Sequence, residues 1–174
     1  MTENIQTIST LHNLLDYEAG RFVIAEVQLK KSLSGWISIA GSLKLKNVLQ
    51  KYQDFIEDHI QKMESFYQEE NIISLDISNR IMKAFIDETE EKLNSCTDPE
   101  VKDACLLSSV QMINHYKISY YGTAAAFAKT LEMEKYASAF HQAEVNEKQI
   151  DDRLSQLAEY EINNRAKTPI VLQE

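Results

Sequence analysis

The sequence predicts an all-α fold, an antiparallel four-helix bundle, from three observations. The 174 residues include only 4 glycines and 2 prolines, so few positions would interrupt a long helix. Hydrophobic residues make up 44% of the chain and recur at helical spacing in four long segments. A more polar stretch separates the second segment from the third, which predicts a long crossover. We therefore expect one domain over residues 1–174, with an ordered core at about 8–166 and a polar C-terminal tail.

The first two helices are expected at about residues 8–40 and 43–70. Gly41 can end the first helix and Ser42 can begin the second, because glycine favours helix ends and serine caps helix starts. One apolar stripe on each helix should face the core. These stripes are Leu11, Leu15, Phe22, Ala25, Leu29, Leu33 and Trp36 in the first helix, and Leu45, Val48, Leu49, Tyr52, Phe55, Ile56, Met63 and Phe66 in the second.

A more polar, amphipathic segment follows a break at residues 71–75 and ends near Cys96. Its apolar residues recur at helical spacing, so we expect a helix here too. This helix would lie in the long connection between the two halves of the bundle. Its apolar positions are Ile77, Ile81, Phe85 and Leu93.

The third helix should begin at Pro99 and run to about Leu131. Asp98 can cap it, and proline is common at the first helical position. The fourth helix should begin after residues 132–133, and Pro169 should lie in a disordered or extended tail. The inner faces are expected to be Val101, Ala104, Cys105, Ser108, Met112, Ser119, Gly122 and Ala126 in the third helix, and Tyr136, Ala137, Phe140, Leu154, Leu157 and Ala158 in the fourth.

A net charge of -9 and an isoelectric point near 5.0 argue against two classes of partner. Such a surface repels both nucleic-acid phosphates and anionic lipid headgroups. The apolar runs are far shorter than the roughly 20 residues that span a bilayer. The polar residues 1–9 also lack the features of a secretory signal. We therefore expect a cytoplasmic protein that binds neither nucleic acid nor membranes.

The sequence offers no support for nucleophilic catalysis. It contains no glycine-rich phosphate loop and no recognisable order of serine, histidine and aspartate. Cys96 and Cys105 are too few for a disulfide framework, and we expect both to be reduced. The chain is therefore more consistent with a protein that is not an enzyme.

Several polar residues interrupt faces that should be apolar, which is where ferritin-like bundles hold metal ligands. If the hairpin turns are as expected, Glu26 and His59 lie at similar heights, and so do His115 and Asp151. Carboxylate and imidazole groups suit a divalent metal such as iron or manganese. The candidate ligands are Glu26, His59, His115, Glu147 and Asp151.

Simpler roles remain open for these residues. His59 and His115 can equally be partly buried histidines that bond to a carboxylate or a carbonyl. Glu144, Glu147 and Asp151 can equally lie on a solvated helix face. The sequence also lacks the Glu-x-x-His pairs of a complete ferritin-type site.

Residues 101–137 and 147–166, with the block 25–29, resemble in order and spacing the bacterial YciE/YciF-type stress-protein family of ferritin-like bundles. The resemblance extends over most of residues 11–166. It implies a four-helix bundle with a crossover, a homodimer and a link to the stress response. It also implies di-iron binding, without an established reaction. The acidic positions that match the family pattern are Glu26, Glu147 and Asp151.

The chain departs from that pattern at four positions. Asn114 and Lys117 stand where the family usually has two glutamates, and Asn146 replaces one acid of a pair. Tyr52 stands where the family often has histidine. Because carboxylates must balance the charge of bound metal, we expect fewer than two iron atoms per chain.

Three functions are compatible with these observations. We favour a homodimeric, ferritin-like, stress-associated helical protein with a degraded or rearranged metal site and no assigned reaction. The alternatives are a di-iron or di-manganese oxidase or peroxide scavenger, and a scaffold that binds a partner helix. Apolar or aromatic residues left over from the core stripes would form the dimer interface. They include Val23, Ile24, Tyr120 and Tyr121.

Overall fold

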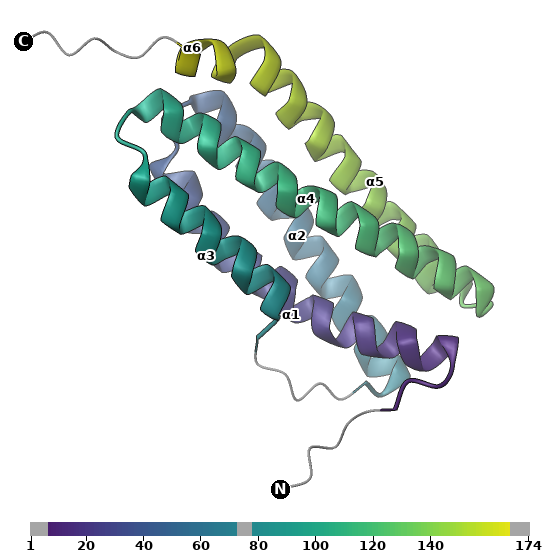
Figure 1. The fold of residues 1–174 in the computed structure, drawn as a ribbon. Coiled ribbons are helices and arrows are strands. Elements are labelled where there is room, and N and C mark those ends of the chain that lie inside the picture. Colours follow the sequence, from purple (N-terminus) through teal and green to yellow (C-terminus); the bar gives the residue numbers. More distant parts are fainter. Residues whose placement is uncertain (1–6, 73–77, 168–174) are drawn as a thin grey trace, which may run out of the picture.

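The computed structural model describes residues 7–72 and 78–167, and all regular structure in these ranges is helical. The elements are α1 (Leu11–Ile39), α2 (Leu43–Glu70), α3 (Arg80–Ser95), α4 (Pro99–Thr130), α5 (Glu134–Leu157), the π-helical turn η1 (Ala158–Ile162) and α6 (Asn163–Lys167). Two long hairpins, α1 with α2 and α4 with α5, lie side by side (Figure 1). The expected four-helix bundle is confirmed.

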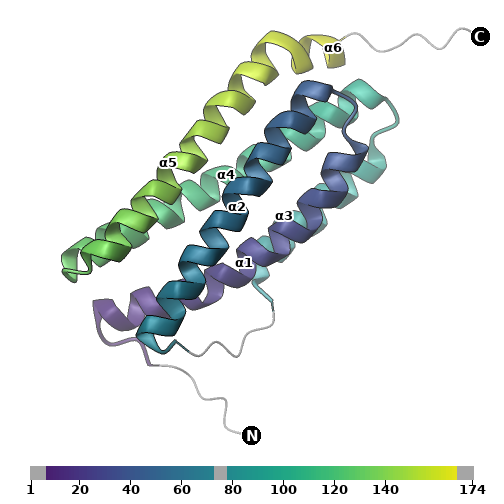
Figure 2. The ribbon, with the colours of Figure 1, turned by 180° about the vertical axis from the view of Figure 1, so that it is seen from behind.

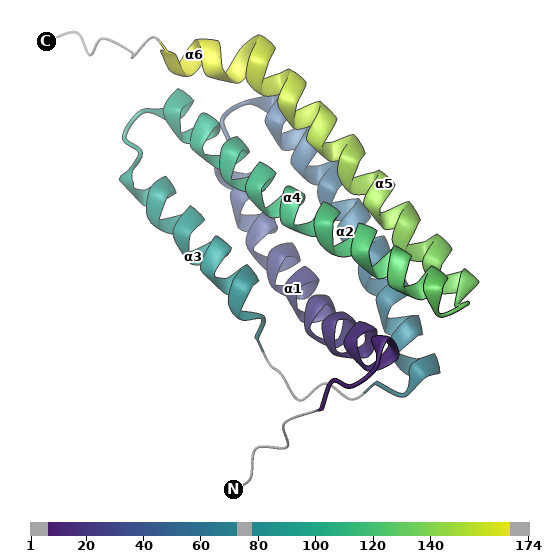
Figure 3. The same cartoon turned by 45° about the vertical axis from the view of Figure 1, so that its right-hand side comes forward.

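The helices α2 and α4 run in the same direction, so the chain must return along the bundle between them (Figure 2). The helix α3 makes this return and packs on α1 and α4. It lies outside the four-helix core (Figure 3). The expected crossover helix is therefore present. No helix in the described ranges is long and apolar enough to cross a membrane.

Side-chain caps set the helix boundaries. The hydroxyl of Ser42 accepts a hydrogen bond from the amide three residues later, at 3.3 Å. Asp98 accepts from the amides two and three residues later, and Pro99 stands in the first turn, as expected. Thr10 caps α1, which therefore begins slightly later than expected. Asn71, with φ of 53°, ends α2.

The apolar stripes expected for α1, α2 and α5 largely face the core, whereas the stripe expected for α4 is wrong. None of the eight residues assigned to that stripe is buried, and Met112 is 47% exposed. The physical reason is that α4 packs against α1, α3 and α5, so its apolar residues lie on several sides. The residues that α4 buries are Asp103, Leu106, Leu107, Ser109, Val110, Ile113, Asn114, Lys117, Tyr121, Ala124 and Ala128.

The crossover helix also turns a partly different face to the bundle from the one expected. Ile81 is 54% exposed, whereas its neighbour Met82 is fully buried. Leu93 is buried and Phe85 is partly buried, in agreement with the expectation. Ile77, residues 73–75 and Pro169 lie outside the described residues.

A buried carboxylate joins the two hairpins at one end of the bundle. Asp103 of α4 accepts hydrogen bonds from the backbone amides of Gly41 at 2.8 Å and Ser42 at 2.7 Å. A Cβ atom at Gly41 would lie 3.2 Å from the Asp103 carboxylate, so glycine gives this acid close access to the turn. The contact sets the height of α1 and α2 relative to α4.

Candidate functional site

Three of the five candidate ligands meet in the middle of the bundle. Glu26 comes from α1, His59 from α2 and Glu147 from α5, and all three side chains are fully buried. Nδ1 of His59 lies 3.6 Å from Oε1 of Glu26 and 3.4 Å from Oε1 of Glu147. The predicted meeting of Glu26 and His59 at one height is confirmed.

The fourth bundle helix contributes a cation to this cluster. Lys117 of α4 is fully buried, and its Nζ lies 3.0 Å from Oε2 of Glu26 and 2.6 Å from Oε1 of Glu147. The same Nζ lies 4.5 Å from the centroid of the Tyr52 ring. Its contacts with the carboxylates are ion pairs whose angles fall outside ordinary hydrogen-bond geometry. One ammonium group therefore lies between the two acids.

Neutral side chains bind the remaining carboxylate oxygens. The Tyr52 hydroxyl donates to Oε2 of Glu147 at 2.8 Å. The Asn114 amide donates to the same oxygen at 2.7 Å and to the Glu147 backbone carbonyl at 3.0 Å. The Tyr121 hydroxyl donates to Oε1 of Glu26 at 2.5 Å. Every carboxylate oxygen of the two acids thus has a polar neighbour inside the bundle.

The imidazole of His59 is held from both sides. Its Nε2 lies 3.3 Å from the side-chain amide of Asn146, and its Nδ1 faces the two carboxylates. If the amide donates to Nε2, the ring proton of a neutral imidazole sits on Nδ1. The edge of the ring also meets Tyr121, with centroids 5.1 Å apart. Asn146 thereby orients His59 toward the acids.

The two buried acids differ in how their charge is stabilised. Burial alone would raise the pKa of Glu26, but the charge of Lys117 and the contacts with His59 and Tyr121 outweigh it and lower that pKa. Burial, together with the nearby charge of Glu26, raises the pKa of Glu147 despite the Lys117 ammonium. Of the two acids, Glu26 therefore more readily carries a negative charge beside the Lys117 ammonium.

The other two candidate ligands, His115 and Asp151, lie outside this cluster. They pair with each other at 3.0 Å, and the His115 side chain is 64% exposed. Asp151 also accepts a hydrogen bond from Gln111 at 3.2 Å. A step of one residue turns a helix by about 100°, so His115 points outward while its neighbour Asn114 is buried.

Comparison with known proteins gives this chain its family. Residues 10–167 match a family described as a domain of unknown function, DUF892. The chain belongs to this family. Protein YciF of Escherichia coli strain K12 is 27% identical to it over 144 residues, which are 82% of this chain and 87% of YciF. The expected relation to YciF-type proteins is confirmed.

Solved structures of similar proteins have the same fold. The crystal structure of the Escherichia coli stress protein YciF covers 92% of this DUF892 chain and 100% of its own, with a TM-score of 0.82 and 26% identity. YcfI of Rhodopseudomonas palustris, put forward as a structural protein, covers 89% of this chain and 97% of its own, with a TM-score of 0.80 and 22% identity.

The buried cluster of this DUF892 protein does not fit two metal ions. Glu26, His59 and Glu147 each offer one ligand atom, all within 4.8 Å of one another. The Lys117 ammonium, however, contacts both carboxylates and would repel a cation placed between them. Asn114 is neutral and cannot bridge two ions as a carboxylate does. The residues present therefore do not support a metal-dependent reaction at this cluster.

A second group of metal-ligating side chains lies near the surface. His12 Nε2 is 3.0 Å from Oε2 of Glu70 and 3.6 Å from Oδ1 of Asp16. Burial of its carboxylate, together with the charge of Glu70, raises the pKa of Asp16 in spite of His12. Sequence analysis did not identify this group, which joins the start of α1 to the end of α2.

Sequence analysis assigned Tyr121 to a dimer interface, and this assignment is wrong. Tyr121 is 1% exposed and belongs to the buried cluster. One signal could have located it, because positions 114, 117 and 121 share one helix face at spacings of three and four. Asn114, Lys117 and Tyr121 are the residues that α4 directs at the two acids.

Proposed function

We propose that this DUF892 protein is a stress-associated, homodimeric helical protein with no assigned metal-dependent reaction, in which a buried ammonium takes the place of metal. The observation that carries this proposal is the position of Lys117, with Nζ within 3.0 Å of Glu26 and 2.6 Å of Glu147. An internal cation neutralises buried acids without any bound ion. The relation to the stress protein YciF supports the stress-associated role.

Metal binding would compete directly with Lys117. A divalent ion needs the same carboxylate oxygens that the ammonium contacts, and the displaced ammonium would remain in the dry interior of the bundle. Unmodified protein should therefore hold fewer than two iron atoms per chain and show no oxidase activity. The same reasoning disfavours an oxidase or a peroxide scavenger with two iron or manganese ions.

Iron stoichiometry tests the metal part of the proposal. The protein is purified aerobically after growth with added iron, and its iron content is measured by elemental analysis. The double variant Asn114→Glu, Lys117→Glu restores two acids and removes the ammonium, so its iron content should rise. The control Lys148→Glu, Asn163→Glu makes the same change of charge at two exposed positions and should leave the iron content unchanged.

Two outcomes would count against this part of the proposal. Two tightly bound irons in the unmodified protein would mean that Lys117 does not exclude metal. No gain of iron in the acid-restored variant would mean that Glu26, His59 and Glu147 are not arranged to bind iron when the ammonium is gone. The exposed pair His12 and Glu70 provides a check, since removal of His12 should not change the result.

A groove on α1 supports the homodimer. Val23, Ile24 and Val27 line it together with Tyr67 of α2, and Val27 is 51% exposed. Apolar side chains of this kind favour a buried interface. Tyr120 stacks on Phe22 at 3.5 Å between ring centroids and so contributes less to the groove. Light scattering at micromolar concentration should give twice the chain mass of 20.0 kDa.

The same groove would suit the amphipathic helix of a partner protein, which is the second candidate function. The solution mass of the purified protein separates the two, because a monomer would leave the groove free for a partner. A cytoplasmic location is also part of the proposal. The net charge of -9, which disfavours anionic membrane surfaces, supports it.

A further inference from the structure

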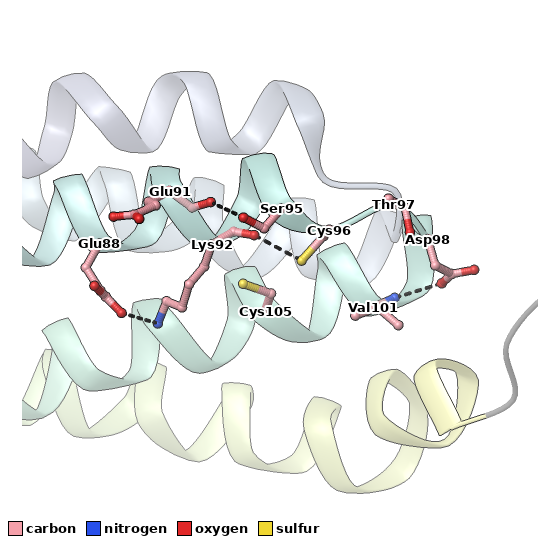
Figure 4. A pocket seen from close by; sticks show the side chains of 9 residues that line it. All are labelled: Glu88, Glu91, Lys92, Ser95, Cys96, Thr97, Asp98, Val101 and Cys105. Carbon is pink, nitrogen blue, oxygen red and sulfur yellow. Dashed lines mark hydrogen bonds and ion pairs between the residues drawn. The ribbon is translucent and has the colours of Figure 1, made fainter.

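The two cysteines of the chain meet where α3 joins α4. Cys96 ends α3 and Cys105 lies in the second turn of α4, and the short connection between the helices makes them antiparallel. Both are free thiols and both are partly exposed. Figure 4 shows the two sulfur atoms in the same space between the helices. The fold therefore brings together two thiols from separate helices.

The two thiols line the same pocket between α3 and α4. Burial and the neighbouring Cys96 raise the pKa of the Cys105 thiol, while the charge of Lys92 acts in the opposite direction. The Cys96 thiol also donates to the Lys92 carbonyl at 3.2 Å. Because both sulfur atoms lie in the same space between α3 and α4, rotation of the two side chains can bring them toward the geometry of a disulfide.

The pair is open to small molecules. Cys96 and Cys105 line a surface pocket together with Lys92, Ser95 and Val101. Partial exposure and a nearby ammonium are the surroundings in which cysteine thiols react with oxidants. Structural cysteines of a core, by contrast, are sealed from solvent and inert.

We propose that Cys96 and Cys105 form a redox-active dithiol site whose substrate is a hydroperoxide. In the first step the Cys96 thiolate attacks the terminal oxygen of the peroxide, which gives a sulfenic acid and releases water or an alcohol. In the second step the Cys105 thiol attacks this sulfur, a disulfide forms and one water leaves. The two thiols thus lose two protons and two electrons in total, and these reduce the O–O bond of the peroxide.

The order of the steps follows from the surroundings of each thiol. Burial disfavours the thiolate of Cys105, which makes this residue the resolving thiol in the proposal. Its position in the same pocket as Cys96 allows it to resolve the sulfenic acid. The product would tie the end of α3 to α4 by a covalent bond.

Mass spectrometry tests this site with the full chain. Reduced protein is treated with a small excess of hydrogen peroxide, blocked with iodoacetamide and analysed intact and as peptides. The expected product is lighter than the reduced protein by two hydrogens, escapes alkylation and yields one peptide pair linked through Cys96 and Cys105. The proposal would be overturned if both thiols escaped oxidation and were recovered in alkylated form, or if disulfides formed only between chains.

Three variants separate the roles of the two thiols. Cys105→Ser should stop at a sulfenic acid on Cys96 that dimedone traps, whereas Cys96→Ser should react at least about 10-fold more slowly. The control Asn94→Cys, Cys96→Ser keeps two thiols but moves one to an exposed position of α3 that does not line the pocket, and it should form no internal disulfide. Equal rates in the two single variants would refute the order of attack. An internal disulfide in the control would refute the need for a thiol at position 96.

Discussion

The Nζ atom of Lys117 lies closer to Glu147, at 2.6 Å, than to Glu26, at 3.0 Å, although Glu26 is the acid with the lowered pKa. The neighbours of the two acids account for this difference. His59 faces both acids, but the Tyr121 hydroxyl donates to Glu26 and favours its anion, whereas the negative charge of Glu26 disfavours a second anion at Glu147. The Lys117 ammonium thus contacts Glu26, which favours the anionic form, and Glu147, which keeps its proton more readily.

Replacement of this ammonium should strongly destabilise the fold at neutral pH. In Lys117→Met both acids lose their cation while they stay buried, so the free energy of unfolding at pH 7 should fall by about 3–5 kcal/mol. Without the cation the pKa values of Glu26 and Glu147 rise, and the variant regains stability as the acids become protonated. Urea unfolding should therefore show a smaller deficit at pH 5 than at pH 7.

The matched control for this variant is Lys148→Met on α5. Lys148 pairs with Glu144 at 2.6 Å, but its side chain is 58% exposed, so water screens the pair. Its removal should change the free energy of unfolding by no more than about 1 kcal/mol at either pH. Equal losses in the two variants would show that burial of Lys117 has no special energetic role.

Tyr121→Phe should weaken the fold without altering the solution mass. The hydroxyl donates to a buried carboxylate, so its loss should cost about 1.5–3 kcal/mol at pH 7. The lowered pKa of Glu26 stabilises the fold above the unfolded value near 4.5, and this stability disappears as pH falls through the folded pKa. The cost of the substitution should therefore shrink in acid. Tyr160→Phe, at a 74% exposed position, is the control.

Buried tyrosines should make the protein sensitive to alkali. Burial and nearby carboxylates or hydroxyls raise the pKa of Tyr52, Tyr120 and Tyr121 well above 10.0. Because the unfolded chain releases these protons first, stability present below pH 10 is lost as pH rises, by about 1.4 kcal/mol per pH unit for each group. Tyrosinate absorbance and circular dichroism should therefore show these three side chains ionising together with unfolding. Ionisation of all 8 tyrosines in a still helical protein would contradict this expectation.

Loss of the carboxylate at the hairpin junction should also destabilise the bundle. Asp103→Ala leaves the amides of Gly41 and Ser42 without their buried acceptor, which should cost about 2–4 kcal/mol in urea unfolding. Asp152→Ala removes an exposed acid and serves as the control. A loss as small as that of the control would mean that water replaces Asp103 at the turn.

Sequence reasoning located the helices because their signals are local. Gly41 and Ser42 mark one boundary, and Asp98 with Pro99 marks another, through hydrogen bonds within a few residues. The buried faces of α1 and α2 could also be predicted from the sequence, since each helix has one buried side and one solvated side. The sequence thus contains enough information for the bundle and its crossover.

The orientation of α4 could not be predicted in the same way. This helix packs against α1, α3 and α5 on different sides, so polar residues such as Ser109, Asn114 and Lys117 lie inside and Met112 lies outside. Lys117 can be buried because Glu26 of α1 and Glu147 of α5 balance its charge. These acids are far from Lys117 in the sequence, so no local sequence pattern predicts the contact. His115 was therefore chosen as a ligand although its neighbour is the residue that faces the site.

A charge placed in the groove of α1 should abolish the proposed dimer. Val27 is 51% exposed beside Val23 and Ile24, so Val27→Glu should leave the fold intact but bury an unpaired carboxylate if a second copy covers the groove. Light scattering should then report a single chain mass where the unmodified protein reports twice that mass. Met112→Glu introduces the same charge at an exposed apolar residue of α4 and should remain dimeric. A dimer that persists in Val27→Glu would place the interface elsewhere, and a monomeric unmodified protein would refute the dimer itself.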